Sequence, residues 1–141
     1  MNIEIAIKKA CQELKNNQIG SALLDSELLL SKVIKKDRKF LLLNLDKELN
    51  QNEQDSFKKL ILKRSRGKPL AYLTGTKSFW NYDFKVNEKV LIPRPDTEII
   101  LEQVLKIYKN KDYINFLEVG IGSGCIALSM LKEKRSFFGT G

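Results

Sequence analysis

The sequence predicts a two-part chain of mixed α+β and α/β class: a small antiparallel helical bundle, then a β-hairpin and the start of an α/β domain. Three observations lead to this. Residues 1–74 carry apolar side chains at helical spacing, and residues 75–92 are rich in aromatic and β-branched side chains. Near the end, a Gly-rich turn separates an apolar strand from an apolar helix. We therefore divide the chain into residues 1–74, 75–92 and 93–141.

The bundle is expected to contain four helices. The first has its apolar face between Ile3 and Leu14, and residues 16–20 form a turn. Ser21 is placed to cap the second helix. The apolar face of this second helix is assigned to Leu23, Leu24, Leu28, Leu30, Val33 and Ile34.

The third and fourth helices have clear start signals. Asp37 can cap a short helix over Arg38–Leu43, and Asn50 with Glu53 has the spacing of a capping box, with Asn in place of the usual Ser or Thr. The fourth helix is expected to end at residues 66–69, because a glycine and then a proline follow its last turn.

A hairpin is predicted after the bundle, with its turn at residues 81–83. Trp80, Tyr82 and Phe84 are assigned to packing within it. Residues 90–92 are expected to form a short strand, which ends at a Pro-Arg-Pro sequence.

The rest of the chain predicts a helix, a strand, a helix and a second strand. Pro95 suits the first turn of the first of these helices. Residues 114–119 read as a buried strand, residues 125–134 as the following helix, and residues 136–140 as the beginning of a second strand.

Length and composition are those of a globular protein. The chain has 141 residues, 43% of them hydrophobic and 30% charged. No apolar run approaches the roughly 18 residues of a membrane span, so we expect a cytoplasmic protein. Histidine, the commonest general base and metal ligand, is absent. Cys11 and Cys125 are expected to be reduced and buried.

Basic residues gather in two clusters, and the formal net charge is +8. The first cluster is Lys32, Lys35, Lys36, Arg38 and Lys39. The second is Lys58, Lys59, Lys63, Arg64, Arg66 and Lys68. Such clusters suit contact with RNA or with an acidic protein. We favour solvated helix faces, because no nucleic-acid recognition motif accompanies the charge.

The chemistry is expected at the Gly-rich turn. Glu118 is followed by Gly120, Gly122 and Gly124, with Ile121 and Ser123 between the glycines. Glycine permits positive φ and leaves no Cβ between the backbone and a ligand. The amides at the start of the following helix are unpaired donors. An acid at the strand end is placed to meet an amino or hydroxyl group of a ligand.

The spacing of these glycines excludes the dinucleotide fingerprint, which requires Gly-x-Gly-x-x-Gly. Even spacing after an acid resembles the nucleotide loop of class I methyltransferases that use S-adenosylmethionine. A structural turn without a ligand and another kind of nucleotide site remain alternatives.

A second motif narrows the resemblance. Residues 66–75 read Arg-Gly-Lys-Pro-Leu-Ala-Tyr-Leu-Thr-Gly, and residues 92–98 read Ile-Pro-Arg-Pro-Asp-Thr-Glu. In this order, before the Gly-rich turn, they closely resemble the release factor glutamine methyltransferases. The resemblance covers nearly the whole chain, including residues 24–30 of the bundle.

The resemblance implies a fold and an activity. These enzymes methylate a glutamine side-chain amide of peptide chain release factors. Their helical domain helps to dock the release factor, and their Rossmann-like domain binds S-adenosylmethionine. Carried over by position, Glu118 and residues 120–124 would bind this cofactor. Residues 91–97 would lie near the active-site mouth or act as a rigid connector. For Arg94, a structural salt bridge and a site role are equally compatible with the sequence.

The sequence also departs from the family pattern. The catalytic Asn-Pro-Pro-Tyr motif does not occur, and Gly141 stands where an acid for the cofactor ribose is expected. No catalytic residue is therefore assigned. We expect a truncated or split methyltransferase domain that is inactive alone. A separate polypeptide that completes the domain is one of the alternatives that the sequence leaves open.

Two other functions remain open. The chain could be a non-catalytic module that binds release factors through its basic bundle. It could also be a fragment of a nucleic-acid adenine methyltransferase, because an amide and an exocyclic adenine amine are both planar nitrogens. RNA binding with a steep salt dependence would favour this second alternative.

Overall fold

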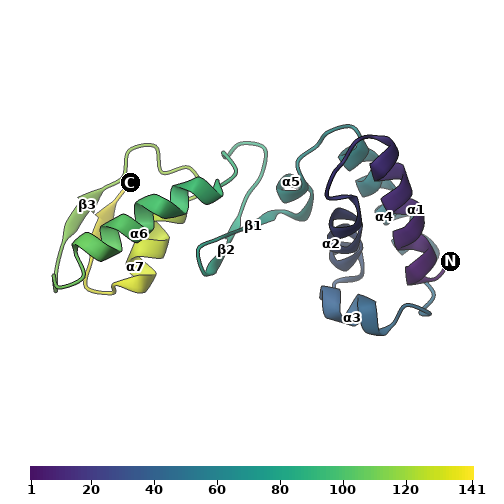
Figure 1. Ribbon diagram of the computed structural model, residues 1–141, viewed down its shortest axis with the longest axis horizontal. Helices are drawn as coiled ribbons and strands as arrows, with labels where there is room; N and C mark the ends of the chain where they lie inside the picture. Colours follow the sequence, from purple (N-terminus) through teal and green to yellow (C-terminus); the bar gives the residue numbers. More distant parts are fainter. The chain divides into compact units, whose positions relative to one another are not determined.

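The computed structural model describes all 141 residues and separates them into two compact units, Met1–Thr74 and Gly75–Gly141 (Figure 1). Each unit has its own hydrophobic core. No helix in the chain combines the length and the apolar character that a membrane span needs.

The first unit is wholly helical apart from one isolated bridge between Asn2 and Glu48. Its helices are α1 (Ile3–Asn16), α2 (Ala22–Ile34), α3 (Arg38–Leu43), α4 (Gln51–Ser65) and α5 (Leu70–Thr74). The helix α2 packs against each of the other four, so it is the centre of the unit. The short helix α5 was not expected from the sequence. It begins directly after Pro69, a residue that suits the start of a helix because it lacks an N–H group.

Local capping signals place two of these helices as predicted. The Asp37 side chain accepts a hydrogen bond from the Phe40 N–H at the start of α3. At the start of α4, Asn50 and Glu53 form a reciprocal capping box, with both hydrogen bonds at 2.9 Å. Ser21 does precede α2, but its side chain makes no capping hydrogen bond, so that part of the prediction was wrong.

The buried face of α2 matches the predicted one only in part. Leu30 is fully buried, and Val33 and Ile34 pack against the core. Leu23 and Leu24 are 52% and 43% exposed, whereas Asp25 and Glu27 are almost fully buried. Each buried carboxylate is paired with an arginine. Asp25 accepts from the Arg64 Nε at 2.7 Å, and Glu27 pairs with Arg38. A buried carboxylate is unfavourable unless it is paired, so these ion pairs allow the two acids to lie on the buried face of α2.

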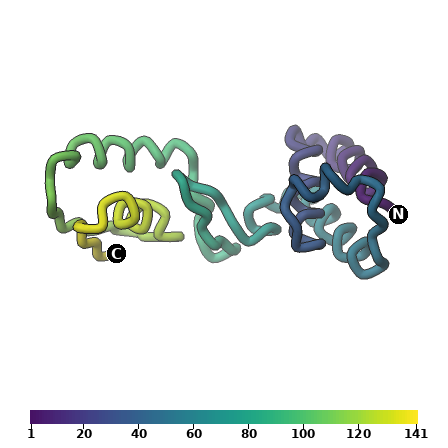
Figure 2. The backbone as a smooth tube through the Cα atoms, turned by 90° about the horizontal axis from the view of Figure 1, so that it is seen from below, coloured from purple at the N-terminus to yellow at the C-terminus, as the bar shows by residue number.

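The second unit contains a hairpin, three helical segments and a small parallel sheet. Its elements are β1 (Thr76–Phe79), β2 (Tyr82–Lys85), a 3₁₀ turn η1 (Pro95–Thr97), α6 (Glu98–Ile107), β3 (Asn115–Leu117), α7 (Cys125–Glu133) and β4 (Phe138–Thr140). The core of this unit includes Phe79, Phe84, Leu101 and Met130. Figure 2 shows α6 running alongside α7 within this unit.

Three strand predictions were wrong. The strand expected to be buried over residues 114–119 is limited to β3, and Leu117 and Val119 are 70% and 89% exposed. The hairpin turns at residues 80–81, with Phe79 opposite Tyr82, so Tyr82 and Asp83 belong to β2 rather than to the turn. Trp80 adopts a positive φ of 56°, a conformation that sequence rules reserve for Gly or Asn. Residues 90–92 form no strand, and Leu91 is 74% exposed.

Both cysteines are free, as predicted. Cys125 is buried, but Cys11 is only half-buried, so the burial prediction was wrong for that residue.

Candidate functional site

The Gly-rich turn joins β3 to α7 at one end of the β3–β4 sheet. These two strands are parallel, with Phe116 opposite Gly139 and Leu117 opposite Thr140, so β3, α7 and β4 form a β–α–β unit. The three glycines between β3 and α7 all have positive φ: 77° at Gly120, 55° at Gly122 and 75° at Gly124. A residue with a Cβ is sterically disfavoured at these positive φ angles. The backbone conformation of the turn therefore explains why glycine occupies the three positions.

The six predicted site residues lie on one continuous stretch, but they differ in exposure. Gly120, Ile121 and Gly122 are exposed, Ser123 and Glu118 are half-buried, and Gly124 is buried at the start of α7. A Cβ on Gly124 would lie 3.1 Å from the side chain of Leu128, in the next turn of the same helix.

The Glu118 side chain is occupied by the protein itself. Its Oε2 accepts a hydrogen bond of 2.9 Å from the backbone N–H of Ala127, in the first turn of α7. Gly124, the N-cap residue, has no side chain, so the acid of the preceding strand supplies the cap. A negative charge there is also favourable to the helix dipole.

The Phe116 ring of β3 packs closely on Gly139, its partner residue in β4. A Cβ added to this glycine would lie 2.3 Å from the Phe116 ring. The ring therefore lies directly over the β4 backbone, on the side of the sheet that faces the second core. Sequence reasoning missed this position, because nothing local to Gly139 marks it.

Trp80 connects the hairpin to both helices of its unit. Its backbone N–H donates to the Glu98 carboxylate at 2.7 Å, and its indole N–H donates to the Glu133 carboxylate at 2.8 Å. Glu98 begins α6 and Glu133 ends α7. The sequence favoured hairpin packing over a substrate platform for Trp80, and carboxylates 18 and 53 residues away gave no local signal of these two hydrogen bonds.

Tyr82 also binds the Glu133 carboxylate. Its hydroxyl donates to Glu133 Oε1 at 3.1 Å, and the Lys132 Nζ lies 4.3 Å from the ring centroid. Partial desolvation, the hydrogen bond to Glu133 and the negative charge of Glu133 all raise the pKa of Tyr82.

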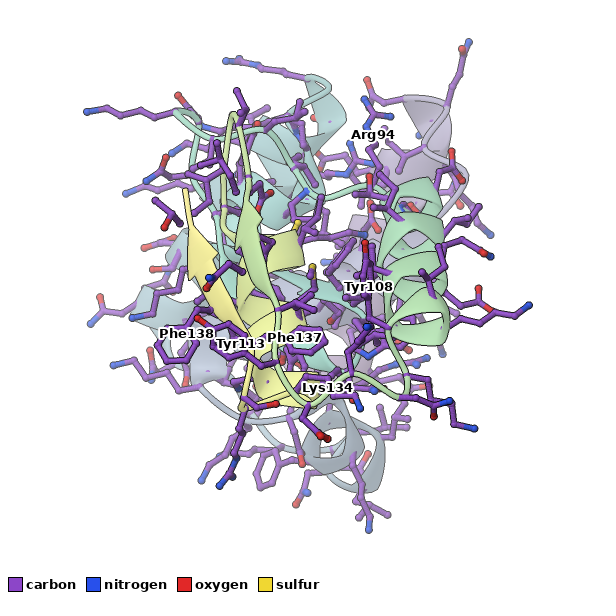
Figure 3. The ribbon with its side chains drawn as sticks, turned by 90° about the vertical axis from the view of Figure 1, so that its left-hand side faces the viewer. Arg94, Tyr108, Tyr113, Lys134, Phe137 and Phe138 are labelled. Atoms are coloured by element: carbon purple, nitrogen blue, oxygen red, sulfur yellow. The ribbon has the colours of Figure 1, made fainter.

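The segment at residues 91–97 was predicted to lie near the site mouth or to act as a connector. Pro93 is buried, and Pro95 begins η1, so prolines hold the entry to α6. Arg94 is exposed and takes part in none of the ion pairs of the chain (Figure 3). This removes the salt-bridge role that the sequence left open for Arg94.

The basic clusters are partly used inside the first unit. Arg38 and Arg64 neutralise the buried acids of α2, and Lys32 donates to the backbone carbonyl of Thr74 at 2.7 Å. Lys36 lies over the Phe40 ring, 5.5 Å from its centroid, as does Lys47, which is outside both clusters, at 5.1 Å. These contacts explain several of the basic residues without an anionic partner.

The second unit therefore contains a parallel β–α–β unit with a glycine turn at the carboxyl end of its first strand, the place at which α/β proteins commonly bind ligands. No group of three or more acids or cysteines in the chain could hold a metal ion.

Comparison with known proteins identifies the family. Residues 6–75 match the PrmC N-terminal domain. A release factor glutamine methyltransferase from Leptospira interrogans is 44% identical over 132 residues, covering 93% of this chain and 46% of that protein. The protein of the same name from Clostridium botulinum is 44% identical over 117 residues, covering 83% of this chain and 41% of that protein. A bifunctional methyltransferase from Rickettsia conorii is 35% identical over 156 residues.

The chain belongs to the release factor glutamine methyltransferase family, as predicted from residues 66–75 and 92–98. It spans less than half the length of these relatives.

Proposed function

We propose that this chain is part of a protein methyltransferase that transfers a methyl group from S-adenosylmethionine to a glutamine side-chain amide of a peptide chain release factor. The observation that carries the proposal is the 44% identity, over 93% of the chain, to a protein of that name. The second unit would then be the start of a Rossmann-like domain, and the first unit would help to dock the release factor. Such an activity belongs in the cytoplasm, where release factors act.

The residues at the Gly-rich turn fit S-adenosylmethionine. The exposed glycines at 120 and 122 leave the backbone open to a ligand. No hydrogen bond joins the N–H groups of Cys125 and Ile126 to another part of the chain, so both can donate to a carboxylate or hydroxyl. Glu118 uses one oxygen for Ala127, and its second oxygen is available to an ammonium group. When bound, the cofactor would supply the methyl group.

The chain contributes binding rather than catalytic groups. It contains no Asn-Pro-Pro-Tyr sequence, and Gly141 stands at the position expected for a ribose-binding acid. In our proposal these groups belong to the portion of the relatives that this chain does not match. The chain alone would bind the cofactor weakly and would transfer no methyl group.

Separate calorimetric titrations of the purified chain with S-adenosylmethionine and with a release factor test the proposal. One-to-one binding of both is the expected result. Binding of the release factor alone would make the chain a non-catalytic docking module. Binding of the cofactor alone would contradict the substrate, and no binding in either titration would overturn the proposal.

Two glycines give a matched control for the cofactor titration. Gly120 and Gly67 both have positive φ, and a Cβ added to either meets no atom within 4 Å. Gly120→Ala and Gly67→Ala therefore introduce the same backbone strain, of about 1–2 kcal/mol, in different units. Only Gly120→Ala should weaken the binding of S-adenosylmethionine. Equal loss in both variants would show that strain, rather than the turn, explains the effect.

The nucleic-acid alternative has its own readout. Titration with a single-stranded RNA at two salt concentrations should give only weak, strongly salt-dependent binding, because the basic residues have no recognition motif. Binding of RNA tighter than that of the release factor would favour the nucleic-acid methyltransferase.

A further inference from the structure

The first basic cluster keeps three of its charges free. Two of its five cations have partners inside the first unit, whereas Lys35, Lys36 and Lys39 are exposed and form no ion pair. Lys47 lies with them in space, because its Nζ and that of Lys36 lie over the same Phe40 ring. Contact with a ring orders a lysine side chain but leaves its charge unneutralised.

The acids beside these lysines are mostly engaged by other groups. Asp37 accepts from the Phe40 N–H as the cap of α3, and Glu48 pairs with the amino group of Met1. Asp46 is the remaining acid of the segment from residue 35 to residue 48. This part of the first unit therefore presents an excess of positive charge to solvent.

Two leucines of α3 lie among these charges. Leu43 is 74% exposed and Leu42 is 50% exposed. Together with Lys39 they have the i, i+3, i+4 spacing of one helix face, and the fully buried Leu41 lies on the opposite face. Figure 1 shows α3 at one end of the first unit. We define the α3 surface as Lys35, Lys36, Lys39, Leu42, Leu43 and Lys47.

The backbone of Lys35 departs from the usual pattern at a helix end. Lys35 is the C-cap residue of α2 and is left-handed, with φ 55° and ψ 40°. Glycine or asparagine is usual in this conformation, because a Cβ is disfavoured there. The end of α2 would thus be more stable with glycine, and local structure does not explain the lysine.

We propose that the α3 surface binds an anionic phospholipid membrane, with Leu42 and Leu43 inserted at the interface and the four lysines on the lipid headgroups. Burial of apolar side chains and attraction of cations to anionic lipids together drive peripheral binding of this kind. Such lipids give the cytoplasmic face of membranes its negative potential. This contact goes beyond the proposed function and does not depend on it.

The composition of the α3 surface favours a lipid surface over a protein partner. All four of its cations are lysines, which are depleted from protein–protein interfaces, whereas arginine and aromatic side chains are enriched there. The nearby Arg38 pairs with Glu27 instead. Docked helices and peptides also use grooves, and none of the six residues lines any of the three cavities of about 370 to 600 Å³.

RNA would also attract the lysines, but it would leave the leucines without a role. Proteins that bind single-stranded RNA stack its bases on aromatic rings or on arginine. The apolar members of the α3 surface are both aliphatic, and the neighbouring Phe40 ring is already in contact with two lysines. A membrane uses both the charges and the leucines.

Co-sedimentation of the full chain with lipid vesicles tests the proposal. The probes are vesicles of phosphatidylcholine alone and vesicles of phosphatidylcholine mixed with phosphatidylglycerol. We expect binding to the mixed vesicles to be at least about tenfold tighter than to phosphatidylcholine alone, and to weaken as salt is added. Equal binding to the two kinds of vesicle, or binding to neither, would overturn the proposal.

Two double variants separate the α3 surface from the net charge of the chain. Lys36→Gln with Lys39→Gln and Lys59→Gln with Lys63→Gln each remove two exposed lysines that form no ion pair. Only the first should weaken binding, by roughly 25-fold, because each lysine near an anionic membrane contributes about fivefold. Equal loss in both would assign the binding to net charge and overturn the proposal.

A second matched pair tests insertion. Leu42 and Leu23 are helical leucines of the first unit, 50% and 52% exposed. Leu42→Ser should weaken binding to the mixed vesicles by about tenfold, and Leu23→Ser should leave it unchanged. An unchanged affinity in Leu42→Ser would exclude insertion and overturn the proposal.

Lys35→Gly separates binding from folding. Glycine suits the positive φ, so this variant should unfold at a higher urea concentration, followed by far-UV circular dichroism, while it binds the mixed vesicles about fivefold more weakly. Unchanged binding would remove Lys35 from the surface. If instead the Lys36 and Lys39 double variant loses affinity for single-stranded RNA and the original chain binds no vesicles, the surface belongs to RNA and the proposal fails.

Discussion

The Glu118 carboxylate is hydrogen-bonded to the backbone N–H of Ala127 at 2.9 Å, so the acid before the glycine turn holds the helix after it. This contact spans the whole turn, because Glu118 follows β3 and Ala127 lies in the first turn of α7. The hydrogen bond therefore sets the position of the backbone N–H groups of Cys125 and Ile126, the two residues before Ala127 in α7. Glu118 therefore has a positioning role whether or not it also contacts a ligand.

Loss of this cap should loosen the second unit. Glu118→Ala is expected to lower the free energy of unfolding by about 1 kcal/mol, as for other N-cap losses, and Glu118→Gln by less, since its amide oxygen can still accept. Trp80 is the single tryptophan and lies in the second unit, so its fluorescence during urea unfolding reports this unit. Identical unfolding of the Ala variant and the original chain would contradict the capping role.

Removing one partner of the Asp25–Arg64 ion pair should lower the stability of the first unit strongly. The Asp25 side chain is 2% exposed and that of Arg64 16%. Asp25→Ala leaves a largely buried cation without its partner, and we expect a loss of about 3–5 kcal/mol of stability. Replacing Asp25 and Arg64 together by Leu and Met should restore much of it. Far-UV circular dichroism during thermal unfolding measures both variants.

An exposed pair provides the control for that experiment. Lys8 donates to Glu4 at 2.6 Å on the surface of α1, with both side chains well exposed. Glu4→Gln should cost no more than about 0.5 kcal/mol, because solvent screens such pairs. A cost equal to that of Asp25→Ala would show that burial is not what makes the Asp25 pair important.

A methyl group on Gly139 should separate β4 from the Phe116 ring. Because the added Cβ would lie 2.3 Å from the ring, Gly139→Ala is expected to cost about 1–3 kcal/mol in Trp80-detected unfolding. Gly20→Ala is the control, since a Cβ there meets nothing within 4 Å and no positive φ is required. Phe116→Leu in the Gly139→Ala background should recover part of the loss. No difference between the two alanine variants would refute the close approach.

Tyr82 should titrate above the ordinary tyrosine range, because partial desolvation and the hydrogen bond and charge of Glu133 raise its pKa. Tyr82 therefore contributes fully to stability below its pKa in the unfolded chain, near 10. This contribution is lost as the pH rises through the higher pKa of Tyr82 in the folded chain. Glu133→Gln removes the charge and should lower the pKa of Tyr82. Tyrosinate absorbance, taken as the difference from Tyr82→Phe, measures it. An unchanged titration in Glu133→Gln would remove Glu133 as a cause.

The sequence predicted best those features that depend on neighbours along the chain. The caps at Asp37 and Asn50 and the bounds of α3 were confirmed, because a cap joins residues only three apart. The glycine turn was also placed correctly, since its three positive φ values are local requirements. The buried face of α2 was predicted only in part, because Asp25 finds its partner 39 residues away.

The sequence by itself determined the family, the helical first unit and the glycine turn, because motifs and short-range hydrogen bonds encode them. Only the tertiary structure decided that Glu118 caps α7, that Trp80 joins the hairpin to Glu98 and Glu133, and that β3 has an open edge. Each of these depends on backbone groups or carboxylates from separate elements meeting in space. Hydrophobic periodicity gives the face of each element but not the partner that the face meets.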